Sequence, residues 1–244
     1  MKTIFSIAIW MYWAVCIIVF FIIVLLLYII TAPFDSYNKM PNQVLSGLGW
    51  LMMKVNPGWS FDINGDEPQK VSQPTIVVAN HQSFLDMPLM YLLPWNMKWV
   101  AKSSLFKIPI LGWLIYLTGH IAIDRRSMRS FKKMDTLVEP IEQGIPGMIF
   151  PEGTRTENGE IQSLKNGAFK LAKRYDFNIL PVVIDGSYQA MPSGSWQINP
   201  KQDFEISVLD PIKVSEFNSA GEIKERVSVL FNRELSAMRS KTMT

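Results

Sequence analysis

The chain has 244 residues, of which 48% are hydrophobic and 18% are charged, and its net charge is +3 at pH 7. Soluble domains usually carry about 25% charged residues, so part of this chain is expected to lie away from water. The small charge excess, without a basic tail or a nucleic-acid-binding motif, argues against a nucleic-acid partner. The single cysteine, Cys16, excludes an intrachain disulfide.

The first element is the apolar stretch IFSIAIWMYWAVCIIVFFIIVLLLYII (4–30), and no charged residue occurs from Thr3 to Phe34. As a helix it would be about 40 Å long at roughly 1.5 Å per residue, whereas the hydrocarbon core of a bilayer is about 30 Å thick. The apolar region of a cleaved signal peptide is shorter, roughly 7–15 residues. The sequence therefore predicts a retained membrane anchor that either spans the bilayer or lies within one leaflet.

A second apolar stretch, NQVLSGLGWLMMKVNPGW (42–59), follows. Its apolar residues recur at helical spacing, and they are Leu45, Leu48, Leu51, Met52 and Val55. This helix either belongs to the core or lies flat on the bilayer beside the first helix. We expect residues 1–60 to form a membrane-anchoring helical segment and residues 61–244 to form a separate α/β domain.

From about residue 70 onward, short apolar runs alternate with helical segments. The runs that read as strands are 75–80, 97–102, 120–123, 147–150, 178–184 and 204–209. The expected helices are 84–93, 103–117, 129–143, 163–175 and 219–239. A possible capping box, Ser219 with Glu222, opens the last of them. This alternation predicts an α/β fold with a mostly parallel sheet flanked by helices, preceded by the N-terminal membrane-associated segment.

Three polar motifs directly follow predicted strands. NHQSFLD follows the run TIVVA, DRR follows HIAI, and PEGTR follows GMIF. The carboxyl ends of parallel strands lie at one edge of the sheet, where such folds have their ligand crevice. We therefore expect these motifs to bring five side chains to one rim: His81, Asp86, Arg125, Glu152 and Arg155.

His81 and Asp86 are the candidate acid–base pair. On a continuous helix, at about 100° per residue, their side chains would point roughly 140° apart, so they meet only if the chain bends between them. A strand end, a turn at 82–83 and a helix starting near Phe84 would supply that bend. The carboxylate would then hold one ring nitrogen and leave the other as a base. The alternative is a histidine that caps the loop and an aspartate that caps the helix.

Other chemistries fit these residues less well. A zinc site needs three or four His, Cys or carboxylate ligands, but the chain has only two histidines, and its cysteine lies in the apolar run. Ser83 lies near His81, but the GxSxG elbow of many seryl hydrolases is absent. We expect no metal and no cofactor. A base without its own nucleophile suits deprotonation of a substrate hydroxyl.

The motif FPEGTR reads as an anion site. Pro151 and Gly153 permit a tight turn with exposed backbone amides, and Arg155 offers a planar fork for phosphate. Arg125 would add a second fork, and Lys165 precedes a helix whose first amides favour anions. A base, a phosphate clamp and a membrane anchor together indicate a phosphorylated lipid with a free hydroxyl as substrate.

The four blocks NHQSFLD, GHIAIDR, FPEGTR and ILPVVI, in this order and at these separations, resemble those of the glycerolipid acyltransferase family. The resemblance covers residues 70–190 and is nearest to the bacterial 1-acylglycerol-3-phosphate acyltransferases (lysophosphatidate acyltransferases). It implies transfer of an acyl chain from acyl-carrier protein or acyl-CoA to the sn-2 hydroxyl of 1-acylglycerol 3-phosphate, which gives phosphatidic acid. One departure is Ala122, where the family usually has phenylalanine.

The resemblance also implies roles for individual residues. His81 would be the general base and Asp86 its orienting partner. The residues with implied acceptor-binding roles are Arg125, Glu152, Gly153 and Arg155, and Pro181 falls in the fourth block. Further candidates for substrate binding are Lys102, Thr154 and Lys165. The implied partners are a lysophospholipid acceptor, an acyl-CoA or acyl-carrier-protein donor, and membrane lipid. The implied location is the cytoplasmic membrane, with the active domain facing the cytoplasm.

Several alternatives stay open from the sequence. The acceptor could be another lysophospholipid, for example of the lysocardiolipin type. The protein could instead be a membrane esterase that uses Ser83, or a lipid-binding protein without catalytic activity. The apolar segment LFKIPILGWLIYL (105–117) either packs on the sheet or lines a groove for an acyl chain.

Overall fold

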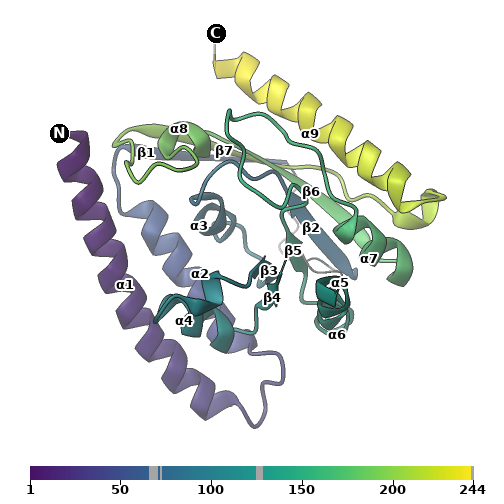
Figure 1. Ribbon diagram of the computed structural model, residues 1–244, viewed down its shortest axis with the longest axis horizontal. Coiled ribbons are helices and arrows are strands. Elements are labelled where there is room, and N and C mark those ends of the chain that lie inside the picture. Colours follow the sequence, from purple (N-terminus) through teal and green to yellow (C-terminus); the bar gives the residue numbers. More distant parts are fainter. Residues whose placement is uncertain (66–70, 72, 125–128, 243–244) are drawn as a thin grey trace.

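The computed structural model describes residues 1–65, 71, 73–124 and 129–242. Within these residues the strands form one sheet in the order β1-β7-β6-β2-β5-β3-β4 (Figure 1). Neighbouring strands are parallel except for β6 and β7. The strands are β1 (Trp59–Asn64), β2 (Thr75–Ala79), β3 (Lys98–Lys102), β4 (Ile121–Ile123), β5 (Gly147–Ile149), β6 (Asn178–Asp185) and β7 (Gln202–Val208). The predicted α/β fold with a mostly parallel sheet is confirmed.

The strand that the sequence does not predict is β1. Its sequence, WSFDIN, lies directly after the second apolar stretch and alternates apolar with polar residues over a short length. It pairs only with β7, a strand from the far end of the chain, so a tertiary contact makes it a strand. The domain boundary expected between residues 60 and 61 therefore falls inside an element of the sheet.

Helices cover both faces of the sheet and bury it in two cores. On β2, Val77 and Ala79 face one core, whereas Ile76 and Val78 face the other. Such burial on both faces explains why this strand is apolar throughout, without alternation. The first core includes residues of α1 (Lys2–Thr31), α2 (Lys39–Lys54), α3 (Asp86–Met90) and α4 (Leu111–Leu117). The second includes residues of α5 (Arg129–Met134), α6 (Val138–Glu142), α7 (Gly167–Tyr175) and α9 (Ala220–Thr242).

The last helix, α9, matches its prediction closely. Its bounds lie close to the expected 219–239, and its apolar face is buried in the second core at Ile223, Val227, Phe231, Leu235 and Met238, with Leu230 partly buried against it. The capping box is present, since Ser219 Oγ accepts the Glu222 N–H at 3.3 Å and the Glu222 carboxylate accepts the Asn218 N–H at 3.0 Å. By contrast, the single helix predicted over 129–143 is divided into α5, a 3-10 turn (Asp135–Leu137) and α6.

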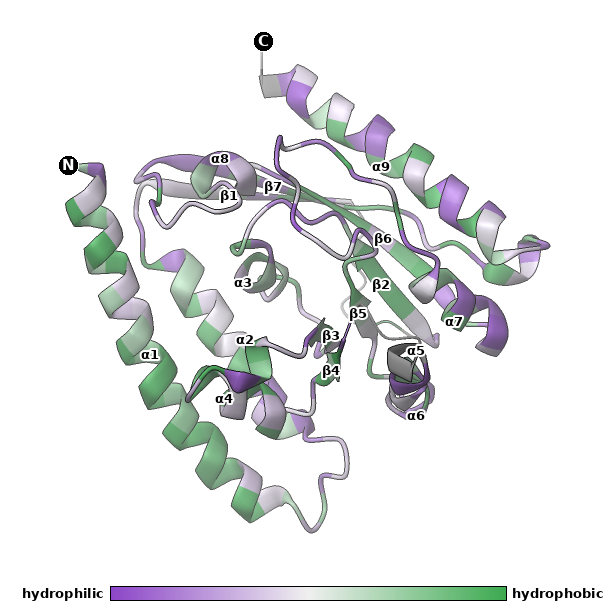
Figure 2. Ribbon diagram, viewed as in Figure 1, coloured by the Kyte–Doolittle hydropathy of each residue, from purple (hydrophilic) through white to green (hydrophobic). Residues whose placement is uncertain are grey.

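The two N-terminal helices form a hairpin that packs against the domain, and α1 also contacts α4. One side of α1 is buried, at Ser6, Ile9, Trp13, Cys16, Val24 and Thr31. Its other side exposes a long row of large apolar residues that includes Ile4, Ile7, Met11, Val15, Ile18, Ile22 and Leu26. Figure 2 shows α1 as hydrophobic along almost its whole length, whereas α9 mixes hydrophilic and hydrophobic residues. By length and composition α1 is able to cross a membrane.

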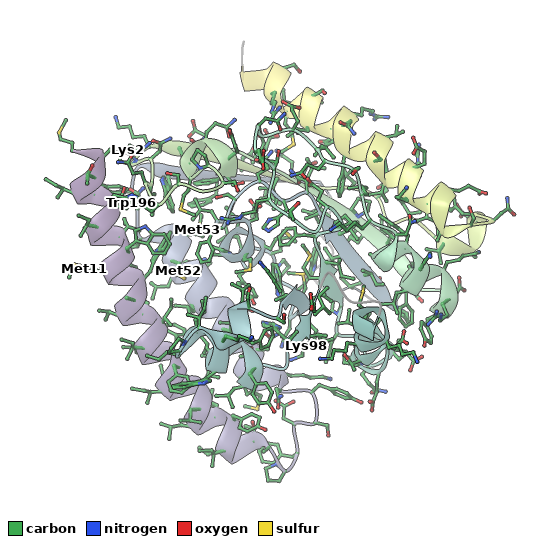
Figure 3. All side chains as sticks on the ribbon, viewed as in Figure 1. Lys2, Met11, Met52, Met53, Lys98 and Trp196 are labelled. Atoms are coloured by element: carbon green, nitrogen blue, oxygen red, sulfur yellow. The ribbon has the colours of Figure 1, made fainter. Side chains whose placement is uncertain are left out.

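The turn of the hairpin is fastened to the domain by a buried lysine. Lys98 on β3 is 1% exposed, and its ammonium group donates to the carbonyl oxygens of Asn38 at 3.3 Å and Thr118 at 2.5 Å. Burial lowers the pKa of Lys98 to about 7, although the Asp35 charge acts in the opposite direction. Figure 3 labels this side chain, which reaches the carbonyl of Thr118, directly after α4.

Candidate active site

His81 and Asp86, at the end of β2, form a contacting pair. His81 Nδ1 lies 2.8 Å from Asp86 Oδ2, and Asp86 is the first residue of α3, so the predicted bend between them is present. Asp86 is fully buried, and its Oδ2 also accepts the backbone N–H groups of Gln82 at 2.6 Å and Ser83 at 2.8 Å. The aspartate is thus held by the backbone of its own loop as an acceptor that faces the histidine ring.

The contacts of His81 determine which ring nitrogen is available for chemistry. A carboxylate accepts hydrogen bonds, so in the neutral ring the Nδ1 nitrogen carries the proton and Nε2 has the free lone pair. One face of the ring stacks on Phe150, with the ring centroids 4.1 Å apart and the planes 10° apart. The side chain is 12% exposed and lines a cavity. The ring is therefore fixed with one basic nitrogen free to act at this cavity.

A residue outside the predicted set completes the surroundings of Asp86. Ser187, the first residue of α8 (Ser187–Ala190), is fully buried, and its hydroxyl donates to Asp86 Oδ1. It follows the end of β6 in the sequence DGS. The rule that directed attention to His81, a polar residue just after a strand of the parallel sheet, would also have found Ser187.

Glu152 is adjacent to His81 but is engaged with the backbone. Its Oε1 accepts the His81 N–H at 2.8 Å and its Oε2 accepts the Gln162 N–H at 3.0 Å, and the residue is 3% exposed. Burial raises its pKa to about 7, while the two backbone donors oppose the shift. Both oxygens thus accept backbone N–H groups, and Glu152 links the loop that carries His81 to the loop after β5.

The cavity at His81 has a volume of about 370 Å³. Its polar lining includes Lys102, Thr154 and Arg155, all of which the sequence proposed. Within the described residues, no hydrogen bond or ion pair engages the Arg155 guanidinium, so its donors are available to a ligand. The other lining residues are Phe84, Met87, Leu105, Glu157 and Ser193.

The other proposed binding residues lie elsewhere. Gly153 has a φ of +75°, and a Cβ there would lie 2.8 Å from Lys165 Nζ, so this position needs glycine for the turn. Lys165 is exposed beside that turn and does not line the cavity. Pro181 is buried inside β6 opposite Val78, so it belongs to the sheet core and not to a binding surface. Arg125 lies outside the described residues.

A second cavity, almost entirely apolar, adjoins the first. The two cavities share Phe84, Met87 and Leu105 in their linings. The second is walled by α1, α2, α3, β3 and α4 through residues that include Ile17, Leu45, Leu48, Met52, Trp99 and Ile115. The apolar segment 105–117 thus contributes Leu105, Leu111 and Ile115 to a cavity wall, and it exposes Trp113 and Tyr116 on its outer side.

Two polar side chains in the lining of the apolar cavity are held neutral. The Tyr91 hydroxyl oxygen lies 3.1 Å from His120 Nε2, and His120 Nδ1 accepts the Trp99 backbone N–H at 3.3 Å. Burial, reinforced by the charge of Lys98, lowers the pKa of His120 well below its usual value. Burial raises the pKa of Tyr91. The cavity therefore carries no charge from either residue and suits a hydrocarbon.

Comparison with known proteins places this site in a family. Residues 60–185 match the family described as Acyltransferase. A 1-acyl-sn-glycerol-3-phosphate acyltransferase of Chlamydomonas reinhardtii is 35% identical over 69% of this chain and 52% of its own length. The beta form of this enzyme from Homo sapiens is 32% identical over 72% of this chain and 65% of its own length. The chain thus spans between half and two thirds of the length of these relatives.

A solved structure matches the whole fold. The crystal structure of the 1-acyl-sn-glycerophosphate acyltransferase PlsC from Thermotoga maritima covers 98% of this chain and 98% of its own length, with a TM-score of 0.83 and 24% sequence identity. At that identity the match shows the fold alone. It includes the N-terminal helices as well as the sheet, because nearly every residue of both chains is aligned.

Proposed function

Since this chain belongs to the acyltransferase family, we propose that it transfers an acyl chain from acyl-CoA or acyl-carrier protein to the sn-2 hydroxyl of 1-acylglycerol 3-phosphate, giving phosphatidic acid. The observation that carries this proposal is the His81–Asp86 contact of 2.8 Å beside a cavity that also holds Arg155 and Lys102. A base and two cations at one cavity suit an acceptor with a hydroxyl and a phosphate.

The chemistry follows from the fixed ring. His81 Nε2 removes the proton from the sn-2 hydroxyl as the oxygen attacks the thioester carbonyl carbon. Asp86 stabilises the imidazolium that forms, because its Oδ2 lies on the Nδ1 proton. When the tetrahedral intermediate collapses, the carbon–sulfur bond breaks and the imidazolium returns its proton to the leaving thiolate. The new ester bond forms without an acyl-enzyme.

The two adjoining cavities divide the substrates by polarity. The phosphate of the acceptor is placed against Arg155 and Lys102, since a guanidinium binds phosphate with two parallel hydrogen bonds. The acyl chain is placed in the neutral, apolar cavity that begins at Phe84, Met87 and Leu105. This arrangement would bring the thioester carbon between the two cavities, next to His81.

The structure also supports an alternative to a spanning anchor. Near its start, α1 is tied to the domain, because Trp10 Nε1 donates to the Trp196 carbonyl at 2.8 Å and Ser6 Oγ accepts the Ile198 N–H at 2.9 Å. Further along, Phe21 packs on Trp113 of α4 at 5.9 Å between centroids. Figure 3 shows Trp196 beside the N-terminal part of α1, with Met11 on the outer side.

A helix held along its length by the domain cannot cross the bilayer alone. We therefore propose that residues 1–60 bind within one leaflet of the cytoplasmic membrane, with the exposed apolar side of α1 in lipid and residues 61–244 facing the cytoplasm. Protease-cleavable tags test this orientation. Both an N-terminal and a C-terminal tag should be protected in intact spheroplasts and cleaved in inverted vesicles. Cleavage of the N-terminal tag alone in spheroplasts would show a spanning helix.

The assay that tests the activity is acyl transfer by the purified full-length protein. It uses a panel of lysophospholipids, with both acyl-CoA and acyl-carrier protein as donors. We expect 1-acylglycerol 3-phosphate to be the preferred acceptor, because Arg155 and Lys102 favour a phosphomonoester. Preference for an uncharged or zwitterionic acceptor would refute the assignment. The esterase alternative is disfavoured, since Ser83 is fully buried and its hydroxyl donates to the Met191 carbonyl at 2.7 Å.

A further inference from the structure

The two oxygens of Asp86 have different partners. Oδ2 receives three contacts, from the His81 ring and from the N–H groups of Gln82 and Ser83. Oδ1 receives a single hydrogen bond within the described residues, from the Ser187 hydroxyl. Gln82 Oε1 also lies 3.3 Å from the Ser187 oxygen. We expect the Ser187 hydroxyl to donate its single proton to Asp86 and not to Gln82, because hydrogen bonds to a charged acceptor are stronger than those to a neutral amide.

We propose that Ser187 is a positioning residue for the catalytic pair, whose hydroxyl fixes the rotation of the Asp86 carboxylate and so keeps Oδ2 on His81 Nδ1. The inference rests on the proposed function, in which His81 is the base. A carboxylate turns as one rigid group about the Cβ–Cγ bond, so its two oxygens move together. The contacts on Oδ2 restrain this rotation at one end of the group, and the bond from Ser187 to Oδ1 restrains it at the other.

The hydroxyl has an electrostatic consequence as well. Each hydrogen bond to a carboxylate stabilises its negative charge. Without the Ser187 donor, Oδ1 would be a buried charged oxygen with no described partner, and an unpaired polar atom of this kind is costly. The charge of Asp86 would then act more strongly on the imidazolium of His81.

Two substitutions separate the hydrogen bond from simple packing. Ser187→Ala removes the donor and leaves a small gap, whereas Ser187→Cys fills the site with a thiol, which is a weak donor. The matched control is Ser207→Ala on β7. Ser207 is 4% exposed, and its hydroxyl donates to Glu234 Oε1 at 2.7 Å. The control therefore loses a part-buried serine bond to a carboxylate, at a position that lines neither cavity.

The experiment measures steady-state acyl transfer against pH with the full-length protein in detergent, alongside thermal unfolding. We expect both Ser187 variants to lose about 10- to 100-fold in kcat, the range found when outer hydrogen-bond partners of functional histidines are removed in metal sites. The acceptor KM should stay within about 2-fold, since the substrate contacts are unchanged. The acid limb of the kcat/KM profile should move to higher pH. Ser207→Ala should keep the wild-type profile.

Wild-type kcat and an unmoved acid limb in Ser187→Cys would overturn the inference, even if Ser187→Ala fails to fold. An equal loss in Ser207→Ala would also overturn it, because the effect would then be one of stability. His81→Ala in the same assay separates this inference from the proposed function. If His81→Ala is inactive while the Ser187 variants are unaffected, only the role of Ser187 is wrong. If His81→Ala keeps its turnover, the proposed base is wrong.

Discussion

The loops that follow β2 and β5 each bring a buried carboxylate to His81, but the two carboxylates have different partners. Asp86 contacts the ring nitrogen at 2.8 Å, whereas Glu152 contacts the backbone N–H of the same histidine, also at 2.8 Å. The first contact affects how readily the ring gains a proton. The second fixes where the ring is. Equal proximity to one histidine therefore does not imply an equal role, because the role depends on which atom is contacted.

The loop after β5 is itself divided between two tasks. Glu152 points into the protein, and Thr156 adds to the support by donating its N–H to the His81 carbonyl at 2.9 Å. Thr154 and Arg155, between them, line the cavity. Between Glu152 and Thr154 lies Gly153, which closes a turn by donating its N–H to the Phe150 carbonyl at 3.1 Å and has a positive φ of +75°. One short motif thus supplies both a support for the His81 loop and a cation that lines the cavity.

The largest effect is expected from removing the base. His81→Ala should lower kcat by about 10²- to 10⁴-fold, the usual contribution of general base catalysis. Membrane association should persist, since α1 and α2 are untouched. Turnover in a purified acyl-transfer assay and sedimentation with membranes measure the two properties. Wild-type turnover in this variant would show that the loop after β2 does not supply the catalytic base.

Asp86→Asn should have an effect nearly as large. The asparagine amide can place an N–H group against His81 Nδ1, which favours the tautomer with its proton on Nε2 and takes away the base. We expect a loss of about 10²- to 10⁴-fold in kcat, as seen when such an orienting aspartate is replaced. The His81→Ala, Asp86→Asn double variant should be no worse than the poorer single variant, because the two residues act as a unit. Additive losses would contradict this.

The next prediction concerns Arg155, the residue of the loop after β5 that lines the cavity. Arg155→Ala should raise the KM for a phosphomonoester acceptor about 10- to 100-fold, which corresponds to roughly 1.5–3 kcal/mol for hydrogen bonds to a charged group. The KM for the acyl donor should change little. Arg155→Lys should recover only part, since a point charge lacks the planar fork. The control is Arg174→Ala, an exposed arginine on α7 that pairs with Asp135. Equal rises in both KM values would show that Arg155 does not bind the phosphate.

Replacing Glu152, the residue of the loop after β5 that points into the protein, should have the smallest effect on turnover. Its pKa of about 7 in the folded protein is above the usual value of 4.5, so the native state binds more protons than the unfolded state between these values. The contribution of Glu152 to stability is therefore complete below pH 4.5 and is lost as pH rises through 7. The loss is on the order of 3 kcal/mol at about 1.4 kcal/mol per pKa unit.

In Glu152→Gln, the side chain no longer gains or loses a proton with pH. The amide also has only one acceptor oxygen for the two backbone N–H donors. Its kcat should fall by no more than about 10-fold, because one hydrogen bond is lost and the ring contacts remain. The free energy of unfolding, measured with denaturant from pH 4.5 to 7 in detergent, should decline less in the variant than in the wild type. A loss of kcat as large as that of Asp86→Asn would place Glu152 in the chemistry and would abolish the contrast between the two loops.

The sequence by itself determined most of the fold. The runs that became β2 and β6 are apolar along their central residues because both faces of these strands are buried, and α9 has a 3.6-residue apolar period with a capping box at its start. These patterns lie within short segments, so they can be recognised without knowing which other segments pack against them. The same holds for the rim, because the ends of parallel strands must lie together. That is why His81, Asp86 and Arg155 could be predicted to meet.

Only the tertiary structure decided what each polar group touches. The FPEGTR motif places Glu152 near the rim, but whether its oxygens meet a ligand or a backbone N–H depends on a contact with His81, 71 positions away. Ser187 reaches Asp86 across 101 positions, and β1 becomes a strand only because β7 lies beside it. The apolar length of α1 is evident from composition, whereas the contacts of Trp10 and Phe21 that hold it along the domain are not. Hydrogen bonds are directional and short, so a pattern in the chain predicts where a group lies, and the folded partners determine what it does.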